Sequence, residues 1–213
     1  MKQIRIERLM KKYRQVIIFQ DIDLVIDNQK YNFLVGGNGT GKSTFIHCLL
    51  GEVKYDGKID IGESSIAYVP ERMHLPDYIS VSNFLVLLAR LDHNHISSIY
   101  DKVKYYLKLF SLEIYEHKPI CKLSQGNRQK VILIQALMKD SDIYIFDEPL
   151  TGLDIHSQKV FLDELRKKKN QDKLIIVSTH RIENYKYRNK NIIQFPLEGL
   201  SLIHISEPTR RTP

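Results

Sequence analysis

Hydrophobic and polar positions alternate with a period of two in the first part of the chain. Residues 3–9 and 16–26 show this alternation, which is typical of half-buried antiparallel strands. Residues 31–35 instead form a short continuous apolar run, which indicates a strand buried on both faces. The N-terminal part is therefore predicted to be rich in strands, with two more at 57–61 and 65–69.

The spacing of the apolar positions changes to that of helices in the middle of the chain. Residues 80–91, 96–110 and 124–139 carry apolar side chains three or four positions apart. These helices interrupt the succession of strands. The block from about 72 to 139 is therefore predicted to be a helical subdomain inserted between strands.

Strands and helices alternate in the remainder of the pattern. Strands are predicted at 142–147, 173–178 and 191–195, with a helix at 155–169 and an earlier one at 44–50. Such alternation favours a mostly parallel sheet. The predicted fold class is α/β, with a mostly parallel central sheet, an N-terminal antiparallel β subdomain and the inserted helical subdomain.

Length and composition exclude several classes of protein. The 213 residues are 43% hydrophobic and 27% charged, which excludes wholesale disorder, collagen and coiled coil. The longest uninterrupted apolar run, residues 84–89, is far shorter than the roughly 20 residues of a membrane-spanning helix. Residues 1–8 lack the apolar core of a signal peptide, so we expect a cytoplasmic protein. Cys48 and Cys121 lack the spacing of a zinc site or disulfide framework.

The net charge of +7 could indicate nucleic acid or an anionic membrane as a partner. The basic residues are, however, spread along the chain, and the one dense run, 166–169, is interpreted as a solvated helix end. Residues 92–95 include two histidines, which we interpret as a polar loop and not as a metal site. No nucleic-acid partner is assigned.

The last residues differ in kind from the rest. Residues 200–210 resemble the translated transposon-end adapter used in preparing sequencing libraries. We interpret 200–213 as a non-native tail, and 1–199 as the functional domain. The alternative is a natural amphipathic strand and tail.

A glycine-rich segment follows the buried strand at 31–35 and matches G-x-x-x-x-G-K-[ST] at every required position. Its residues are Gly36, Gly37, Asn38, Gly39, Thr40, Gly41, Lys42 and Ser43. The glycines let backbone N–H groups curl around phosphate oxygens, and the following helix adds its positive end. Lys42 is expected to reach the β- and γ-phosphates, Ser43 to bind Mg²⁺, and Thr44 to add a phosphate contact. We call residues 36–43 the phosphate loop; it predicts a P-loop NTPase.

Two carboxylates stand at the end of the apolar strand at 142–147. Asp147 can hold Mg²⁺, directly or through water, and Glu148 can act as general base toward an attacking water. Taken alone, the pair could equally be an ordinary acidic exit from a strand. With a phosphate loop upstream, it is the expected partner of that loop.

Five more segments complete an ordered set. They are Tyr13 after a basic pair, Tyr-Val-Pro-Glu ending at Glu71, Leu-Ser-Gln-Gly-Asn containing Ser124 and Gly126, Gly-Leu-Asp ending at Asp154, and Ser-Thr-His ending at His180. With the phosphate loop and the two carboxylates, residues 1 to about 196 resemble the ATPase subunit of ABC transporters. The combination and order of the motifs make the resemblance specific.

The resemblance implies roles for these residues. Tyr13 would stack on the adenine ring of ATP, and His180 would contact the γ-phosphate, although each residue alone is more often structural. Ser124 and Gly126 would face the γ-phosphate of ATP bound to a second ATPase subunit, and Asp154 would lie across that dimer interface.

Glu71 would lie in the loop that senses Mg²⁺ and contacts a membrane partner. Three departures from the common family pattern accompany these matches. Gly37 stands in place of proline, Glu71 in place of glutamine, and Gln125 and Asn127 replace glycine and glutamine in the signature. Tyr-x-Pro-Glu looks like a variant found in bacterial exporters of peptides and drugs.

Each motif occurs once, so the resemblance implies a head-to-tail homo- or heterodimer with two ATP molecules between the subunits. The predicted function is ATP hydrolysis that powers a bacterial transporter, an exporter, from the cytoplasmic face of the membrane through a separate permease. The alternative is a soluble ABC-type ATPase, such as one of cofactor assembly. An idle regulator is disfavoured by intact Lys42, Asp147, Glu148 and His180.

Overall fold

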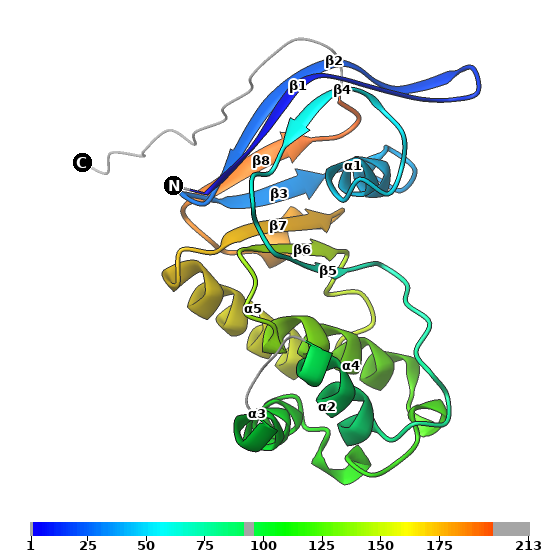
Figure 1. The fold of residues 1–213 in the computed structure, drawn as a ribbon, viewed down its shortest axis with the longest axis vertical. Helices are drawn as coiled ribbons and strands as arrows, with labels where there is room; N and C mark the ends of the chain where they lie inside the picture. The colour runs from blue at the N-terminus through cyan, green and yellow to red at the C-terminus, as the bar shows by residue number, and fades with distance from the viewer. Residues whose placement is uncertain (1, 92–95, 198–213) are drawn as a thin grey trace. The chain divides into compact units, whose positions relative to one another are not determined.

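The computed structural model describes residues 2–91 and 96–197 (Figure 1). The chain divides into two compact units, which we call the first unit (1–64 with 174–213) and the second unit (65–173). Residues 92–95, interpreted above as a polar loop, and the tail at 200–213 lie outside the described residues.

An antiparallel sheet opens the first unit. Strand β1 (Gln3–Tyr13) pairs on one side with β2 (Val16–Asp27) and on the other with β4 (Asp56–Asp60). Figure 1 shows β1 and β2 as a long blue hairpin. The sheet confirms the predicted antiparallel strands, but β1 extends beyond residue 9. Register shifts after Ile6 and Leu9 and a left-handed Arg8 break the alternation, so the period of two is lost before the strand ends.

Three parallel strands form the second layer of this unit. Strand β3 (Tyr31–Val35) lies between β7 (Leu174–Thr179) and β8 (Lys190–Gln194), in the order β7-β3-β8. Val35 is paired with both Thr179 and Gln194, so all three strands end at one edge. Helix α1 (Lys42–Leu49) begins just after this edge. The short helix η3 (Ile182–Asn184) lies between β7 and β8 in the chain.

Three aromatic rings connect the layers of the first unit. The ring centroids of Phe19 on β2, Phe45 on α1 and Phe195 after β8 lie 5.6–6.2 Å apart, in edge-to-face arrangements. All three side chains are at most 2% exposed. Such a cluster is favourable beyond its buried area, so it fixes α1 against the antiparallel sheet and the end of β8.

Helices dominate the second unit. Its parallel strands β5 (Ile66–Val69) and β6 (Ile143–Asp147) pair directly with each other. Between them in the chain come α2 (Val81–Leu91), α3 (Ile96–Leu109), η1 (Glu113–Tyr115), η2 (Ile120–Lys122) and α4 (Gln125–Met138). Helix α5 (Ile155–Asn170) follows β6. The three long helices between β5 and β6 agree with the helical spacing of the sequence.

The solvated helix end predicted at 166–169 is wrong for Lys168. Its side chain is 9% exposed, its Nζ lies 4.7 Å from the centroid of the Tyr144 ring, and it donates to the Lys139 carbonyl at 3.0 Å. The last turn of α5 packs on the connection between α4 and β6, so one lysine of the run points inward. Arg166 and Lys167 remain on the surface.

No helix within the described ranges is both long and apolar enough to cross a membrane.

Candidate functional site

The phosphate loop leaves the end of β3 and is fixed by its glycines. The Gly36 N–H donates to the Thr179 carbonyl at 3.3 Å, which carries the β3–β7 ladder one residue further. A Cβ on Gly36 would lie 2.7 Å from the Phe195 carbonyl oxygen, so a larger residue would displace backbone. Gly41, at the N-terminus of α1, has φ of 101°, a conformation that favours glycine.

Lys42 is folded into this loop. Its Nζ donates to the carbonyls of Gly36 at 2.7 Å and Gly37 at 2.9 Å, and its side chain is 6% exposed. Thr40 Oγ1 also donates to the Gly37 carbonyl, at 2.9 Å. The loop therefore presents a positioned ammonium group at the start of a helix, a donor set that fits a polyphosphate.

The remaining loop residues have exposures that suit ligand contact. Gly37, Asn38 and Gly39 are exposed at its crest, while Ser43 and Thr44 in the first turn of α1 are half-buried. Backbone groups at the crest are thus open to a ligand, and the two hydroxyl side chains lie on the helix that follows.

The structure brings His180 to the same edge as the phosphate loop. His180 directly follows β7, and the pairing of Val35 with Thr179 means that Gly36 and His180 leave neighbouring strands side by side. His180 is exposed, and the next residue turns because the Arg181 N–H donates to Thr179 Oγ1 at 3.0 Å. His180 is therefore an exposed side chain at the edge from which the phosphate loop leaves.

Tyr13 lies at the end of β1, in the same unit. Its side chain is 45% exposed, and Lys11 Nζ lies 4.3 Å from the ring centroid. That ammonium also donates to the Lys54 carbonyl at 2.6 Å. The ring is thus supported by a fixed cation and exposed enough to stack on a flat base.

The two predicted carboxylates lie in the second unit, at the end of β6. Asp147 is 2% exposed and Glu148 is 8% exposed. Glu148 has φ of 49°, a left-handed conformation that is uncommon for a residue with a side chain, and its carbonyl accepts from the Thr151 N–H at 3.2 Å. Nothing in the sequence pattern predicted it.

The loop containing Glu71 leaves the same edge of the β5–β6 pair. Val69 is paired with Phe146, so Glu71 and Asp147 follow neighbouring strands at their carboxyl ends. Glu71 is exposed. Of the three predicted Mg²⁺ ligands, Glu71 and Asp147 therefore belong to the second unit, whereas Ser43 belongs to the first.

Ser124 and Gly126 begin helix α4 as predicted. Ser124 is the N-cap, with its Oγ accepting from the Asn127 N–H at 3.3 Å. A Cβ on Gly126 would lie 2.7 Å from the Gly152 carbonyl oxygen. Gly126 is therefore required for a close approach between the start of α4 and the loop that follows β6.

Asp154 caps helix α5 and is connected to α4. It accepts from the Ser157 N–H at 2.8 Å and forms an ion pair with Lys130 on α4, Nζ to Oδ2, at 2.8 Å. The Lys130 ammonium, followed by the Ser157 N–H, holds the pKa of Asp154 well below its usual value. Sequence reasoning missed Lys130; the signal was a lysine on a helix face that is otherwise buried.

Comparisons with known proteins identify the family that the chain matches. Residues 19–151 match the family model described as ABC transporter. An ABC transporter ATP-binding protein of Mycoplasma pneumoniae is 30% identical over 199 residues, covering 85% of this chain. The chain spans 61% of the length of that relative.

Two further relatives have names that state a direction of transport. The SkfA peptide export ATP-binding protein SkfE of Bacillus subtilis is 30% identical, covering 86% of this chain and 81% of its own length. The zinc import ATP-binding protein ZnuC of Rickettsia conorii is 33% identical, and the match covers 78% of this chain and 72% of that protein. A solved structure described as the ATP binding subunit of an ABC transporter is 25% identical, with a TM-score of 0.81 over 90% of this chain and 85% of that one.

Proposed function

Because this chain belongs to the ABC transporter family, we propose that it is an ATP-hydrolysing subunit that powers a transporter whose permease is a separate chain. The observation that carries the proposal is the phosphate loop with Lys42 folded into it and His180 at the same strand edge. We assign this activity to residues 1–199. The helices between about 72 and 139 are the part proposed to face the permease.

ATP is the proposed nucleotide, bound with Mg²⁺. Lys42 and the backbone N–H groups of the phosphate loop would hold the phosphates, with Thr44 adding a contact and Tyr13 stacking on the adenine. Ser43, Asp147 and Glu71 supply the hard oxygen atoms that Mg²⁺ prefers. Bound Mg²⁺ supplies neutralisation of the negative charge that develops on the phosphate oxygens.

Glu148 is the proposed general base. A water molecule would attack the γ-phosphorus, Glu148 would take its proton, and the bond from phosphorus to the β–γ bridging oxygen would break. The left-handed backbone of Glu148 supports this role because it fixes where the carboxylate leaves the strand. His180 would hold a γ-phosphate oxygen in the reactive geometry.

A dimer is proposed because the signature segment must reach ATP on another subunit. Ser124 and Gly126 at the start of α4, and Asp154 at the start of α5, would face a second ATPase subunit, identical or homologous. ATP would make contacts that exist only in the closed dimer, so it would shift the open–closed equilibrium toward closure. Hydrolysis would remove those contacts.

Export is the proposed direction of transport, with a peripheral location on the cytoplasmic face of the membrane. Glu71, which stands where glutamine is common, and the similarity to a peptide export protein support it. The comparable similarity to a zinc import protein argues the other way, so direction needs its own test.

The decisive experiment is purification of tagged protein from detergent-solubilised membranes, with identification of the proteins that copurify. Recovery of a polytopic membrane protein would support the transporter function and give access to its substrate. Direction would follow from ATP-dependent transport in inside-out vesicles. Purely cytosolic recovery with soluble partners would contradict the transporter and favour a soluble ABC-type ATPase with the same ATP site.

A further inference from the structure

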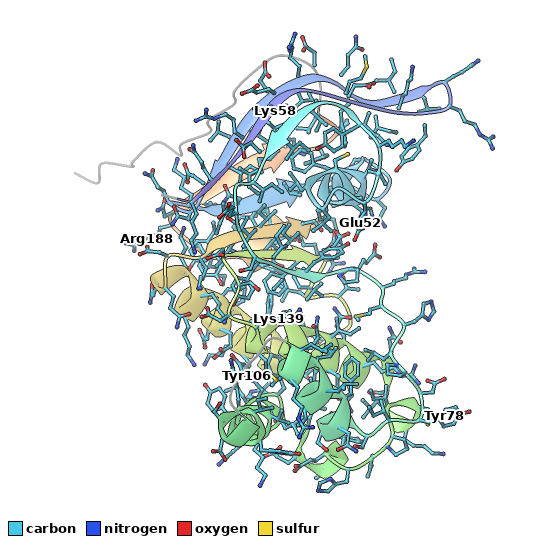
Figure 2. The ribbon with its side chains drawn as sticks, viewed as in Figure 1. Glu52, Lys58, Tyr78, Tyr106, Lys139 and Arg188 are labelled. Carbon is cyan, nitrogen blue, oxygen red and sulfur yellow. The ribbon has the colours of Figure 1, made fainter. Side chains whose placement is uncertain are left out.

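Four lysine side chains gather around one pocket of the second unit, and none of them belongs to the proposed ATP site. They surround an open surface pocket of ≈ 540 Å³. The lining residues are Lys102, Tyr106, Lys139, Asp140, Lys168, Gln171 and Lys173. We call this cavity the lysine pocket; Figure 2 labels Tyr106 and Lys139.

The four lysines come from four parts of the unit: α3, the α4–β6 connection, α5 and the residues just after α5. Hydrogen bonds position three of them. From α3, Lys102 Nζ donates to the Met138 carbonyl, and from α5, Lys168 Nζ donates to the Lys139 carbonyl at 3.0 Å. Lys173 Nζ donates to Asp140 Oδ1 at 2.6 Å. Two of these contacts satisfy carbonyls at the C-terminal end of α4, which is a structural role. Because each ammonium has three N–H donors, these contacts also leave donors for a ligand.

The charges around the pocket do not balance. Four ammonium groups line it, against the single carboxylate of Asp140. The next carboxylate, Glu164 on α5, is already bonded to the Tyr106 hydroxyl at 3.1 Å and to Lys167 Nζ at 2.6 Å. The helix contacts therefore explain where the lysines lie, but not why so many of them surround one cavity.

Among the pocket lysines, Lys168 is the one whose pKa is clearly lowered by this environment. Burial, and then the like charges of Lys102 and Lys173, lower the pKa of Lys168 to about 8, against the opposing effect of Asp140 and Glu164. An anion in the pocket would reverse this effect, because it would stabilise the charged form of Lys168. Binding near pH 8 would then be accompanied by uptake of part of a proton.

We propose that the lysine pocket binds a soluble phosphate-bearing anion with at least two negative charges. Ammonium groups act as point charges that suit phosphate oxygens. Here they line one pocket from α3, from the α4–β6 connection, from α5 and from the residues just after α5. Tyr106 is only 6% exposed, so the pocket offers no open aromatic face for a nucleobase. The geometry points to a compact phosphoanhydride such as pyrophosphate, and not to a nucleoside.

Isothermal titration calorimetry with pyrophosphate tests the proposal. The titration uses the full chain carrying Lys42→Ala, which weakens binding at the phosphate loop. Gln171→Glu adds a negative charge to the pocket without removing any lysine, and Asn170→Asp makes the same charge change one residue earlier, at an exposed position outside the pocket. Wild-type protein is titrated in parallel, so that the test does not depend on the folding of Lys42→Ala. Wild-type protein should bind two pyrophosphates. Protein carrying Gln171→Glu alone should bind one of them tightly.

We expect saturable binding of one pyrophosphate to Lys42→Ala protein. Gln171→Glu should weaken it about tenfold or more, because like charges at close range are strongly unfavourable, while Asn170→Asp should change it less than about twofold. At pH 8, buffers of different ionisation heat should reveal proton uptake that Lys168→Met abolishes. Equal affinities for the two acidic variants, or no saturable binding, would overturn the proposal.

A vesicle assay distinguishes a lipid headgroup as the source of the phosphate. Protein is mixed with vesicles of phosphatidylcholine, with or without phosphatidic acid, in the presence and absence of pyrophosphate. Soluble pyrophosphate should bind to the protein without vesicles, and the Gln171→Glu substitution should weaken this binding. Binding to phosphatidic acid vesicles with none to soluble pyrophosphate would overturn the soluble ligand. The pocket uses no residue of the ATP site, so ATP turnover reports on the proposed function separately.

Discussion

The phosphate loop and the lysine pocket are two sites that we propose to bind anions, and they are built differently. Each buries a lysine whose ammonium donates to backbone carbonyls, Lys42 at 6% exposure and Lys168 at 9%. The loop consists of eight consecutive residues and relies on backbone N–H groups. The pocket collects side chains from positions as far apart as 102 and 173. A site that binds an anion through backbone groups can thus be identified from a short contiguous motif. A site made of side chains that are distant in sequence can be identified only in the folded structure.

The largest expected effect separates the two sites directly. Lys42→Ala should reduce ATP turnover to background, because it removes the cation proposed to reach the β- and γ-phosphates. Pyrophosphate binding at the lysine pocket should persist in the same protein. Phosphate release assays and calorimetry on one preparation measure both. If a folded Lys42→Ala protein failed to bind pyrophosphate, the phosphate loop would be the binding site and the lysine pocket would not be a second one.

The next effect concerns the chemistry that only the proposed ATP site should support. Glu148→Gln should slow ATP turnover about 100-fold or more, since a positioned general base contributes about that much. ATP should then stabilise a dimer, detectable by size-exclusion chromatography. The amide keeps the shape of the side chain, so folding should be unchanged by circular dichroism. Turnover at the wild-type rate would remove Glu148 from the role of base.

A third prediction uses the exposed aromatic ring of the proposed ATP site, because the aromatic ring at the lysine pocket, Tyr106, is buried. Tyr13→Ala should weaken ATP affinity about tenfold, because base–aromatic stacking contributes about 1–3 kcal/mol. Turnover at saturating ATP should stay close to that of wild type. Tyr78→Ala is the matched control, since Tyr78 is 92% exposed and has no assigned role. Fluorescent ATP titration measures the change; equal affinities for the two variants would return Tyr13 to a packing role.

The last prediction concerns the charge imbalance in the lysine pocket. Lys168 has a folded-state pKa of about 8, below the ordinary 10.5, so the unfolded chain binds more protons between these values. Stability should therefore rise with pH across this window, while below pH 8 the cost of burying the charge is fully present. The contribution is on the order of 1–3 kcal/mol at most.

Urea unfolding between pH 8 and 10.5 measures this contribution as a difference. Lys168→Met should lose the rise, because the titrating group surrounded by Lys102, Lys173, Asp140 and Glu164 is gone. Lys159→Met, at an exposed position of the same helix, should keep it. Parallel pH profiles for wild type and Lys168→Met would show that Lys168 titrates as an exposed lysine does.

The same contrast explains what could be predicted from the sequence. The phosphate loop was predictable because Gly41 and Lys42 act through local backbone geometry at fixed spacing. The strands and helices were predictable because burial on one or both faces imposes a period. The end of β1 was not, since its register shifts interrupt the alternation before Tyr13.

Features that depend on tertiary contacts could not be predicted from the sequence. The burial of Lys168 arises because α5 packs on Tyr144 and Lys139, and a lysine run gives no sign of which member faces inward. The contact between Lys130 and Asp154 joins positions 24 residues apart in numbering, on different helices. The left-handed backbone of Glu148 is not encoded by its residue type, since glutamate has no preference for it.

The ion pair between Lys130 and Asp154 has a consequence for motion when it is considered with the contact of Lys168. The first joins α4 to the start of α5, and the second joins the end of α5 to the residue that follows α4. The two helices, 14 and 16 residues long, are thus fastened to each other near both ends. Their amide hydrogens should exchange with solvent as one cooperative unit, and a signal arriving at either helix would be carried by the pair as a single rigid body.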